Sequence, residues 1–291
     1  MKHAFLIMAG AIDEALLEII QQLDSQQHDF YIHIDLKAGI ITEERVKKVA
    51  KLSNVKFIDR MNGTWGGFSL VRIELRLLRA AYAKHEYEYY HLLSGQDFPV
   101  KTNRQIDEFF AQNKGQNFLE VSDRLETQNP DRYRLRYQQY HFLQDRFVGK
   151  KRNIFKYIDF FSCYVQRYVG INRTRKISIQ SGSQWFSINN DLTRYILNHE
   201  DWITKHFKYT YCCDELFIQS LISNTRFMKT LSENLRYVDF IWKSKHNLTP
   251  RYLTSDDLFL IEKPNYLFAR KFTSDSMSQF RSRIQESESN L

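Results

Sequence analysis

Two adjacent carboxylates, Asp214 and Glu215, open an apolar run with helical spacing, DELFIQSLI (214–222). Such residues support general base chemistry, in which a positioned carboxylate accepts a proton from a weakly acidic hydroxyl. The structural alternative is a first-turn acid that complements the helix dipole, and these residues alone favour that alternative. Consecutive side chains on a helix diverge by about 100°, so only one of the two acids can face a ligand.

Three cations late in the chain could offset the charge of a phosphate group. Arg270 and Lys271 interrupt an apolar run, 266–272, and Arg251 precedes them. At an effective dielectric of about 20, the attraction between two opposite unit charges about 4 Å apart is roughly 4 kcal/mol. Two well-placed cations could therefore stabilise a leaving diphosphate without a metal ion.

Several common sites are absent from the sequence. It has no Walker phosphate loop and no G-x-G-x-x-G after the first strand, which argues against classical ATP and dinucleotide sites. No His or Cys pair has zinc spacing, and we expect Cys163, Cys212 and Cys213 to be small buried residues in a reducing cytoplasm. Sheets that bind sugar nucleotides often carry a metal-binding Asp-x-Asp motif, but SGQD (94–97) has one carboxylate there. We expect no metal, and Asp97 to order its own turn.

The elements that position these residues alternate between strands and helices. Repeated βα units predict an α/β fold with a mostly parallel central sheet, helices on both faces and ligands beyond the carboxyl ends of the strands. Asp35 and the loop 94–99 fall on that rim. We expect strands at 3–9, 30–35, 55–59, 89–93, 116–121, two around Gly182 within 177–188, and 235–242, with helices at 14–23, 42–52, 70–81, 103–112, 154–168, 191–198, 214–222 and near Asp256.

The 291 residues suffice for one large domain, which we expect to cover 1–272. Residues 1–125 are expected to form its nucleotide-binding half and 126–272 its acceptor and catalytic half. The polar C-terminal tail, 273–291, is expected to be mobile or loosely helical. The apolar stretch near the N-terminus, about seven residues long, is too short to span a membrane.

A basic segment, 131–176, holds 12 Lys or Arg against 3 Asp, whereas the net charge of the whole chain is +8. This predicts a localised anionic partner, namely a phospholipid surface, a diphosphate-linked acceptor or nucleic acid, unless the segment is only a solvated basic face. Its aromatics either contact an anionic membrane peripherally or belong to the core. Arg146, Lys150, Lys151 and Arg152 precede a helical stretch that bears Phe155, Phe160, Phe161, Tyr164 and Tyr168.

The competing functional class is a basic nucleic-acid-binding protein. Tyr and Arg alternate in YRLRY (133–137), and the pI is about 9.2. The sequence contains no recognisable nucleic-acid module, so we expect no nucleic-acid partner.

Six motifs in one order resemble a single enzyme family. They look like the core-2 and I-branching N-acetylglucosaminyltransferases and the related peptide xylosyltransferases, including bacterial members. The likeness runs from about His3 to Phe272. It implies a nucleotide-diphospho-sugar transferase (GT-A-like) fold, a UDP-sugar donor, inversion at the anomeric carbon and no metal or other cofactor. The motifs are HID (33–35), WGG (65–67), HLLSGQDFPVKTN (91–103), GSQWFSI (182–188), DELFIQSLI (214–222) and LFARKF (267–272).

The resemblance also implies residue roles. Glu215 matches the family's catalytic base, and Asp35 falls where the family contacts uridine. Arg251 and Lys271, with Arg270 beside them, would bind the diphosphate. The implied donor sugar is GlcNAc, with xylose, galactose and glucose as alternatives, and the acceptor is a glycan or lipid-linked oligosaccharide. Expected acceptor contacts are Phe240, Trp242 and, more weakly, Trp185.

The chain departs from the animal enzymes of this family in three ways. It lacks their membrane anchor, their paired cysteines, and the proline before the Asp-Glu motif, where Cys213 stands. The first two differences predict a bacterial cytoplasmic enzyme, peripheral at the inner face of the membrane if the basic segment docks there. A catalytically dead relative, which binds UDP without turnover, remains a third alternative.

Overall fold

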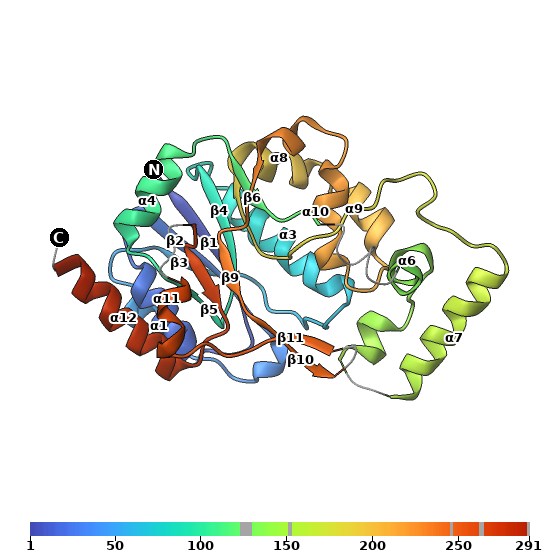
Figure 1. The fold of residues 1–291 in the computed structure, drawn as a ribbon, viewed down its shortest axis with the longest axis horizontal. Helices are drawn as coiled ribbons and strands as arrows, with labels where there is room; N and C mark the ends of the chain where they lie inside the picture. The colour runs from blue at the N-terminus through green and yellow to red at the C-terminus, as the bar shows by residue number, and fades with distance from the viewer. Residues whose placement is uncertain (123–129, 151–152, 245–246, 262–264, 290–291) are drawn as a thin grey trace.

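Seven strands form the central sheet of the computed structural model, which describes residues 1–122, 130–150, 153–244, 247–261 and 265–289 (Figure 1). β1 is parallel to β2 and β4, β2 to β3, and β6 to β8, whereas β7 is antiparallel to both of its neighbours. The predicted mostly parallel sheet is therefore confirmed. In spatial order the strands are β3 (Val55–Phe57), β2 (His28–Ile34), β1 (His3–Ala9), β4 (Tyr89–Ser94), β7 (Phe186–Asn189), β6 (Asn117–Leu119) and β8 (Leu231–Ser232).

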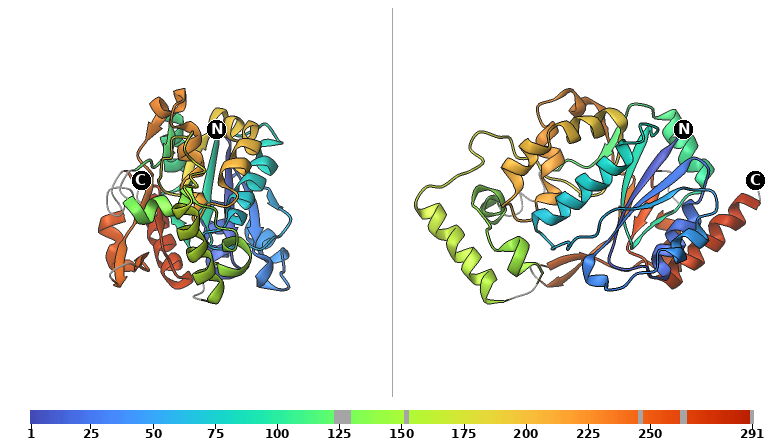
Figure 2. Two further views of the ribbon diagram at one scale, coloured as in Figure 1. Left: turned by 90° about the vertical axis from the view of Figure 1, so that its right-hand side faces the viewer. Right: turned by 180° about the vertical axis from the view of Figure 1, so that it is seen from behind.

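Alternate residues of β1 face two hydrophobic cores, as the two-residue period of a strand requires. Ala4 and Leu6 pack with α3, α8, α9 and α10, while Phe5 and Ile7 pack with α1, α4 and α12. Figure 2 shows helices on both sides of the sheet, as predicted. The helices are α1 (Glu14–Leu23), α2 (Glu44–Val49), α3 (Phe68–Tyr82), α4 (Asn103–Gln112), α6 (Pro130–Gln138), α7 (Ile154–Tyr168), α8 (Asn190–Asn198), α9 (Glu200–Phe207), α10 (Phe217–Ile222), α11 (Leu258–Ile261) and α12 (Ser274–Ser289).

A second, three-stranded sheet has the order β5 (Asp97–Pro99), β12 (Phe268–Arg270), β9 (Arg236–Val238). The antiparallel register of β5 and β12 sets Arg270 opposite Asp97. The single strand expected at 235–242 is wrong, because Asp239 separates β9 from the hairpin strand β10 (Phe240–Ser244), which pairs with β11 (Asn247–Pro250).

Helix α12 corrects the expectation of a loosely held C-terminal tail. Its residues Met277, Phe280 and Ile284 are buried in the core shared with α1. Arg281 forms an ion pair with Glu18 of α1, with Nε 3.0 Å from Oε2. The tail is polar in composition, but one stripe of apolar side chains suffices to pack it.

The two strands expected around Gly182 are only half present. β7 forms, but the residues before it make a single bridge, between Ser181 and Ser122. The expected helix near Asp256 is present as a 3-10 turn, Ser255–Asp257, followed by α11. All three cysteines are buried and unbridged, as predicted. Across the described residues, no helix combines the length and apolar character needed to cross a bilayer.

Candidate active site

A pocket with a volume of about 220 Å³ opens where β1 and β2 end. This is the carboxyl edge of parallel strands, where open α/β sheets bind ligands. The pocket brings together four segments that are far apart in the sequence. It is lined by Met8, Ala9, Gly10, His33, Asp35, Gly63, Leu70, Ile73, Gln184 and Trp185.

Asp35, the predicted uridine contact, lines this pocket and also orders its wall. Its Oδ1 accepts a hydrogen bond from the Lys37 amide at 2.8 Å, and Oδ2 accepts one from the Gly63 amide at 3.0 Å. The Lys37 ammonium is 3.7 Å from Oδ2. The carboxylate therefore caps the turn after β2, as the structural alternative proposes, and its contact with uridine stays a prediction.

His33 belongs to the same wall. Its Nε2 accepts a hydrogen bond from the Met61 amide at 3.2 Å, and burial lowers the pKa of the imidazole. A ring that accepts at Nε2 and resists protonation is neutral at physiological pH. It fixes the loop that leads to Gly63 and adds no charge to the pocket.

Arg270 stacks on the pocket residue Trp185. The guanidinium carbon is 4.3 Å from the Trp185 ring centroid, and Nε is 3.3 Å from Asp97 Oδ1. Nε and Nη1 of Arg270 are buried without a hydrogen-bond partner among the described residues. Asp97 Oδ2 accepts a hydrogen bond from the Ser94 amide at 2.6 Å, so this side chain orders the turn between β4 and β5. A buried cation with unsatisfied donors beside a pocket suits an anionic ligand.

Arg236, which the sequence analysis did not single out, lies behind this pair. It is buried, and its Nη2 donates to the Leu92 carbonyl at 3.3 Å and to Ser187 Oγ at 3.1 Å. Burial lowers its pKa to about 9, with Asp97 opposing the shift and Arg270 adding to it. Arg236 ties β4 to β7 underneath the pocket wall.

Glu215 ends a single 3-10 turn, Cys213–Glu215. The continuous helix expected at 214–222 is wrong, because buried Leu216 has φ −130° and ψ −34°, outside the helical range, and α10 begins after it. Cys212 precedes the turn at φ 50°, in the left-handed region. Both acids therefore lie in a 3-10 turn that precedes α10, and neither belongs to the first turn of α10 itself.

The Glu215 carboxylate forms an ion pair with Arg136 and is partly exposed. Arg136 of α6 donates from Nη2 to Oε2 at 2.6 Å, and the Glu215 side chain is 40% exposed. Its backbone carbonyl accepts from the Gly182 amide at 3.0 Å. A Cβ at Gly182 would overlap the Glu120 carbonyl oxygen, so only glycine fits there. The segment from Gly182 onward thus leads directly from Glu215 to the pocket residues Gln184 and Trp185.

Two buried acids, Asp214 and Glu74, lie next to Glu215 and the segment that begins at Gly182. Asp214 is 9% exposed; burial first, and then the charge of Glu215, raise its pKa to about 7. Glu74 of α3 is fully buried; burial and the charge of Asp214 raise its pKa well above the usual range, and Gln184 Nε2 donates to its Oε1 at 2.7 Å. Of the two neighbouring acids, Asp214 is buried and Glu215 is partly exposed, and which of them faces a ligand stays a prediction.

Arg251 and Lys271 are joined through their backbones. The Lys271 amide donates to the Arg251 carbonyl at 3.3 Å, and the Lys271 carbonyl accepts from the Leu253 amide at 2.7 Å. The structure therefore places all three predicted donor cations in one neighbourhood, since Arg270 directly precedes Lys271.

The Arg251 guanidinium is already engaged by carboxylates. Nη1 and Nη2 bind Asp257 at 2.9 and 2.5 Å, and Nε binds Asp239 at 2.6 Å. Hydrogen bonding to Arg251 is the main cause that lowers the pKa of Asp257. An incoming diphosphate would have to share or replace these partners.

The predicted acceptor contacts are dispersed. Phe240 is exposed at the start of the β10–β11 hairpin, paired with Pro250 next to Arg251. Trp242 lies in β10, but its side chain is outside the described part of the structure. Arg270 stacks on one face of the Trp185 ring. Acceptor binding by these three aromatics stays a prediction.

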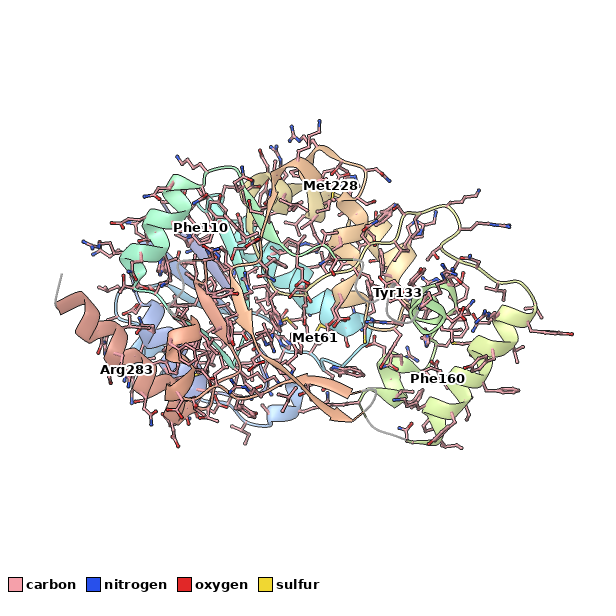
Figure 3. The ribbon with its side chains drawn as sticks, in the orientation of Figure 1. Met61, Phe110, Tyr133, Phe160, Met228 and Arg283 are labelled. Carbon is pink, nitrogen blue, oxygen red and sulfur yellow. The ribbon has the colours of Figure 1, made fainter. Side chains whose placement is uncertain are left out.

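The sequence contained signals for the residues that were not singled out. His33 and Gln184 lie inside the motifs HID and GSQWFSI, and Glu74 is an acid on the apolar stripe of α3. Arg136 was part of the Tyr and Arg alternation that suggested nucleic acid. That explanation is wrong for the tyrosines, because Tyr133 (labelled in Figure 3) and Tyr137 are buried and cannot stack on bases.

Comparison with known proteins identifies the family. Human (Homo sapiens) Xylosyltransferase 2 is 24% identical over 236 residues, which cover 79% of this chain and 25% of that protein. Xylosyltransferase oxt of Drosophila pseudoobscura pseudoobscura is 25% identical over 280 residues, which cover 87% and 29%. The chain thus spans between a quarter and a third of the length of these curated relatives.

The crystal structure of mouse Xyloside xylosyltransferase 1 in its apo form superposes with a TM-score of 0.38 and 8% identity, covering 92% of this chain and 96% of that one. A family model described as Core-2/I-Branching enzyme matches residues 3–259, and this match, with the sheet order, confirms the predicted family and its nucleotide-diphospho-sugar transferase fold. The chain belongs to the Core-2/I-branching enzyme family of glycosyltransferases.

Proposed function

We propose that this chain is an inverting, metal-independent glycosyltransferase that moves a sugar from a UDP-sugar to a hydroxyl of a glycan or lipid-linked oligosaccharide. The observation that carries the proposal is the position of Glu215, a half-exposed carboxylate held by Arg136 and joined through Gly182 to the pocket wall. Its Oε1 makes no hydrogen bond to any described residue, which leaves it available to an acceptor hydroxyl.

The proposed reaction is a single displacement. The acceptor oxygen forms a bond to the anomeric carbon while the bond from that carbon to the UDP oxygen breaks, and Glu215 takes the hydroxyl proton. Attack from the face opposite the leaving group inverts the anomeric centre. Arg270, Lys271 and Arg251 stabilise the charge that develops on UDP.

The surroundings of Asp97 support independence from a divalent metal. This carboxylate stands where related sheets carry a metal-binding motif, yet it is buried, accepts from the Ser94 amide and faces Arg270. A carboxylate already paired with a guanidinium is a poor ligand for a dication, because the cation next to it repels the metal. Two groups of metal-ligand side chains do cluster among the described residues, around His3 and around His141, but neither includes a pocket residue.

We predict that sugar transfer survives excess EDTA. The cations that would replace the metal are part of the chain, so chelation leaves them in place. Release of UDP from a UDP-sugar, measured with and without EDTA on protein purified without metal, checks this. If chelation stops turnover and manganese restores it, the metal-independent mechanism is wrong.

The donor sugar is the finer part of the proposal. GlcNAc is our first choice, while the names of the matching relatives favour xylose as the second candidate. We predict that a UDP-sugar raises the melting temperature and that the preferred donor does so most, because a ligand that binds only the folded state stabilises it by mass action.

Thermal shift against UDP-GlcNAc, UDP-xylose, UDP-galactose and UDP-glucose ranks the donors. A melting temperature unchanged by every UDP-sugar and by UDP itself would contradict the proposed function. Stabilisation by UDP without transfer to any acceptor would instead indicate a catalytically dead relative.

A further inference from the structure

Helix α7 presents its apolar face to solvent. The described part of the chain packs against one side of α7 only. Figures 1 and 2 show this helix at the opposite end of the molecule from α12, away from the central sheet. At about 100° per residue, seven uncharged side chains fall within an arc of about 120°. All seven are between 46% and 92% exposed: Ile154, Tyr157, Ile158, Phe161, Tyr164, Val165 and Tyr168. Figure 3 shows side chains on the outer edge of α7 pointing away from the protein.

The inward face of α7 is polar, and it is bound by specific hydrogen bonds. Asp159 Oδ2 is 2.6 Å from His141 Nδ1, and Oδ1 accepts from the Leu143 amide at 3.1 Å. Gln166 accepts from the Tyr140 amide at 2.7 Å and donates to the Tyr140 carbonyl at 3.0 Å. Burial lowers the pKa of His141, but hydrogen bonds to Asp159 and Cys163 outweigh it and raise that pKa to about 9. Turning the helix to bury its apolar face would break every one of these bonds.

The charges around α7 are positive. Arg146 and Lys150 are exposed just before the helix, Arg175 and Lys176 are exposed after it, and Lys151 and Arg152 lie outside the described residues. Each acid of the basic segment already has a partner. Asp131 binds Arg167, Asp145 binds Arg72, and Asp159 binds His141.

We propose that the outer face of α7, the seven side chains named above, docks on an anionic phospholipid surface. An amphipathic helix with aromatic and aliphatic residues on one side and cations around it lies in the interface of such a bilayer, with the apolar side chains among the acyl chains. A second copy of the chain is a poorer occupant, because it would bring two basic segments together. This inference goes beyond the proposed function and does not depend on it.

Docking would fix the orientation of the candidate site relative to the bilayer. The turn before α7, Gln144–Val148, is tied to the loop that follows Gly63. Asp145 Oδ1 accepts from Ser69 Oγ at 2.6 Å, its carbonyl accepts from Thr64 Oγ1 at 2.9 Å, and Gln144 donates to the Trp65 carbonyl at 2.8 Å. A membrane-bound α7 would therefore fix the orientation of the pocket wall relative to the lipid.

The test is flotation of the full chain with vesicles of phosphatidylcholine, alone or mixed with phosphatidylglycerol. We expect the wild type to float with the anionic vesicles at low salt and much less with the neutral ones. The triple variant Phe161→Ser, Tyr164→Ser, Tyr168→Ser should lose at least about tenfold in partitioning, because it removes the apolar surface that enters the interface. Arg146→Gln with Lys150→Gln should weaken binding about fivefold for each cation removed.

A matched control removes three exposed apolar side chains elsewhere: Ile40→Ser, Leu52→Ser and Phe259→Ser. It should float like the wild type. Melting temperatures of all variants check that they fold, and the substituted side chains are exposed, so little change is expected.

Several outcomes would overturn the proposal. The wild type could stay unbound with anionic vesicles at low salt, or the α7 triple variant could float as well as the control. Sedimentation of the wild type as a dimer that the α7 triple variant converts to a monomer would show that a second copy covers this face instead.

Discussion

Replacing Glu215 by glutamine lowers the turnover of sugar transfer at least about a hundredfold and leaves UDP-sugar affinity near the wild-type value. A positioned general base contributes about 10²–10⁴-fold, because a sugar hydroxyl attacks poorly while it keeps its proton. Glutamine preserves the size of the side chain but cannot accept that proton. The hydrogen bond from Arg136 can persist, since the amide oxygen accepts in place of Oε2. Single-turnover kinetics with excess enzyme separates the chemical step from binding.

Asp214→Asn is the control for this result. Asp214 is buried beside Glu215, and its raised pKa keeps it partly protonated near pH 7, so it is a poor candidate for the base at that pH. We expect the asparagine variant to retain most of its turnover. Wild-type turnover in Glu215→Gln combined with a dead Asp214→Asn would show that the other carboxylate is the base. Activity in both variants would reject the mechanism.

Removing the predicted diphosphate ligands weakens UDP binding. Lys271→Ala and Arg251→Gln should each lower UDP affinity about 10- to 100-fold, because a hydrogen bond to a charged group contributes about 1.5–3 kcal/mol. Transfer should slow as well, since charge on the diphosphate grows in the transition state. Calorimetric titration with UDP measures the affinity.

The Arg251 variant needs a control for stability, because it leaves Asp257, which is buried, without its main partner. Arg281→Ala removes an arginine of similar burial, which is paired with Glu18 of α1 and does not line the pocket. It should lower the melting temperature and leave UDP affinity unchanged. If both Lys271→Ala and Arg251→Gln are folded and bind UDP like the wild type, these residues are not part of the donor site.

The α/β framework was predictable because its signals are local. The apolar strand 3–9, the capped helix after Asp13 and the helix 103–112 each follow from residue spacing, and all three form as expected. The family motifs then brought Asp35, Glu215 and Arg270 to attention. The structure places Asp35 at the pocket and Arg270 against its Trp185 wall.

What the sequence could not supply are contacts between distant segments. Nothing local links Arg136 to Glu215 across 79 residues, or Gln184 to Glu74 across 110. The break at Leu216 was missed because its apolar neighbours keep helical spacing although its backbone leaves the helix. The orientation of α7 could not be predicted from the sequence either, because its amphipathic pattern is the same whether the apolar face points inward or outward.

Burying Glu74 and Asp214 beneath the pocket has a thermodynamic consequence. The pKa of Asp214 rises from 3.8 to about 7 on folding, so between these pH values the native chain holds a proton that the unfolded chain has released. Stability falls with rising pH wherever the native state binds more protons, and Glu74 acts in the same direction. Above about pH 7 the loss from Asp214 is complete, on the order of a few kcal/mol. The two hydrophobic cores must offset this loss at neutral pH, and the two buried acids therefore destabilise the fold that carries the site less under mildly acidic conditions than above pH 7.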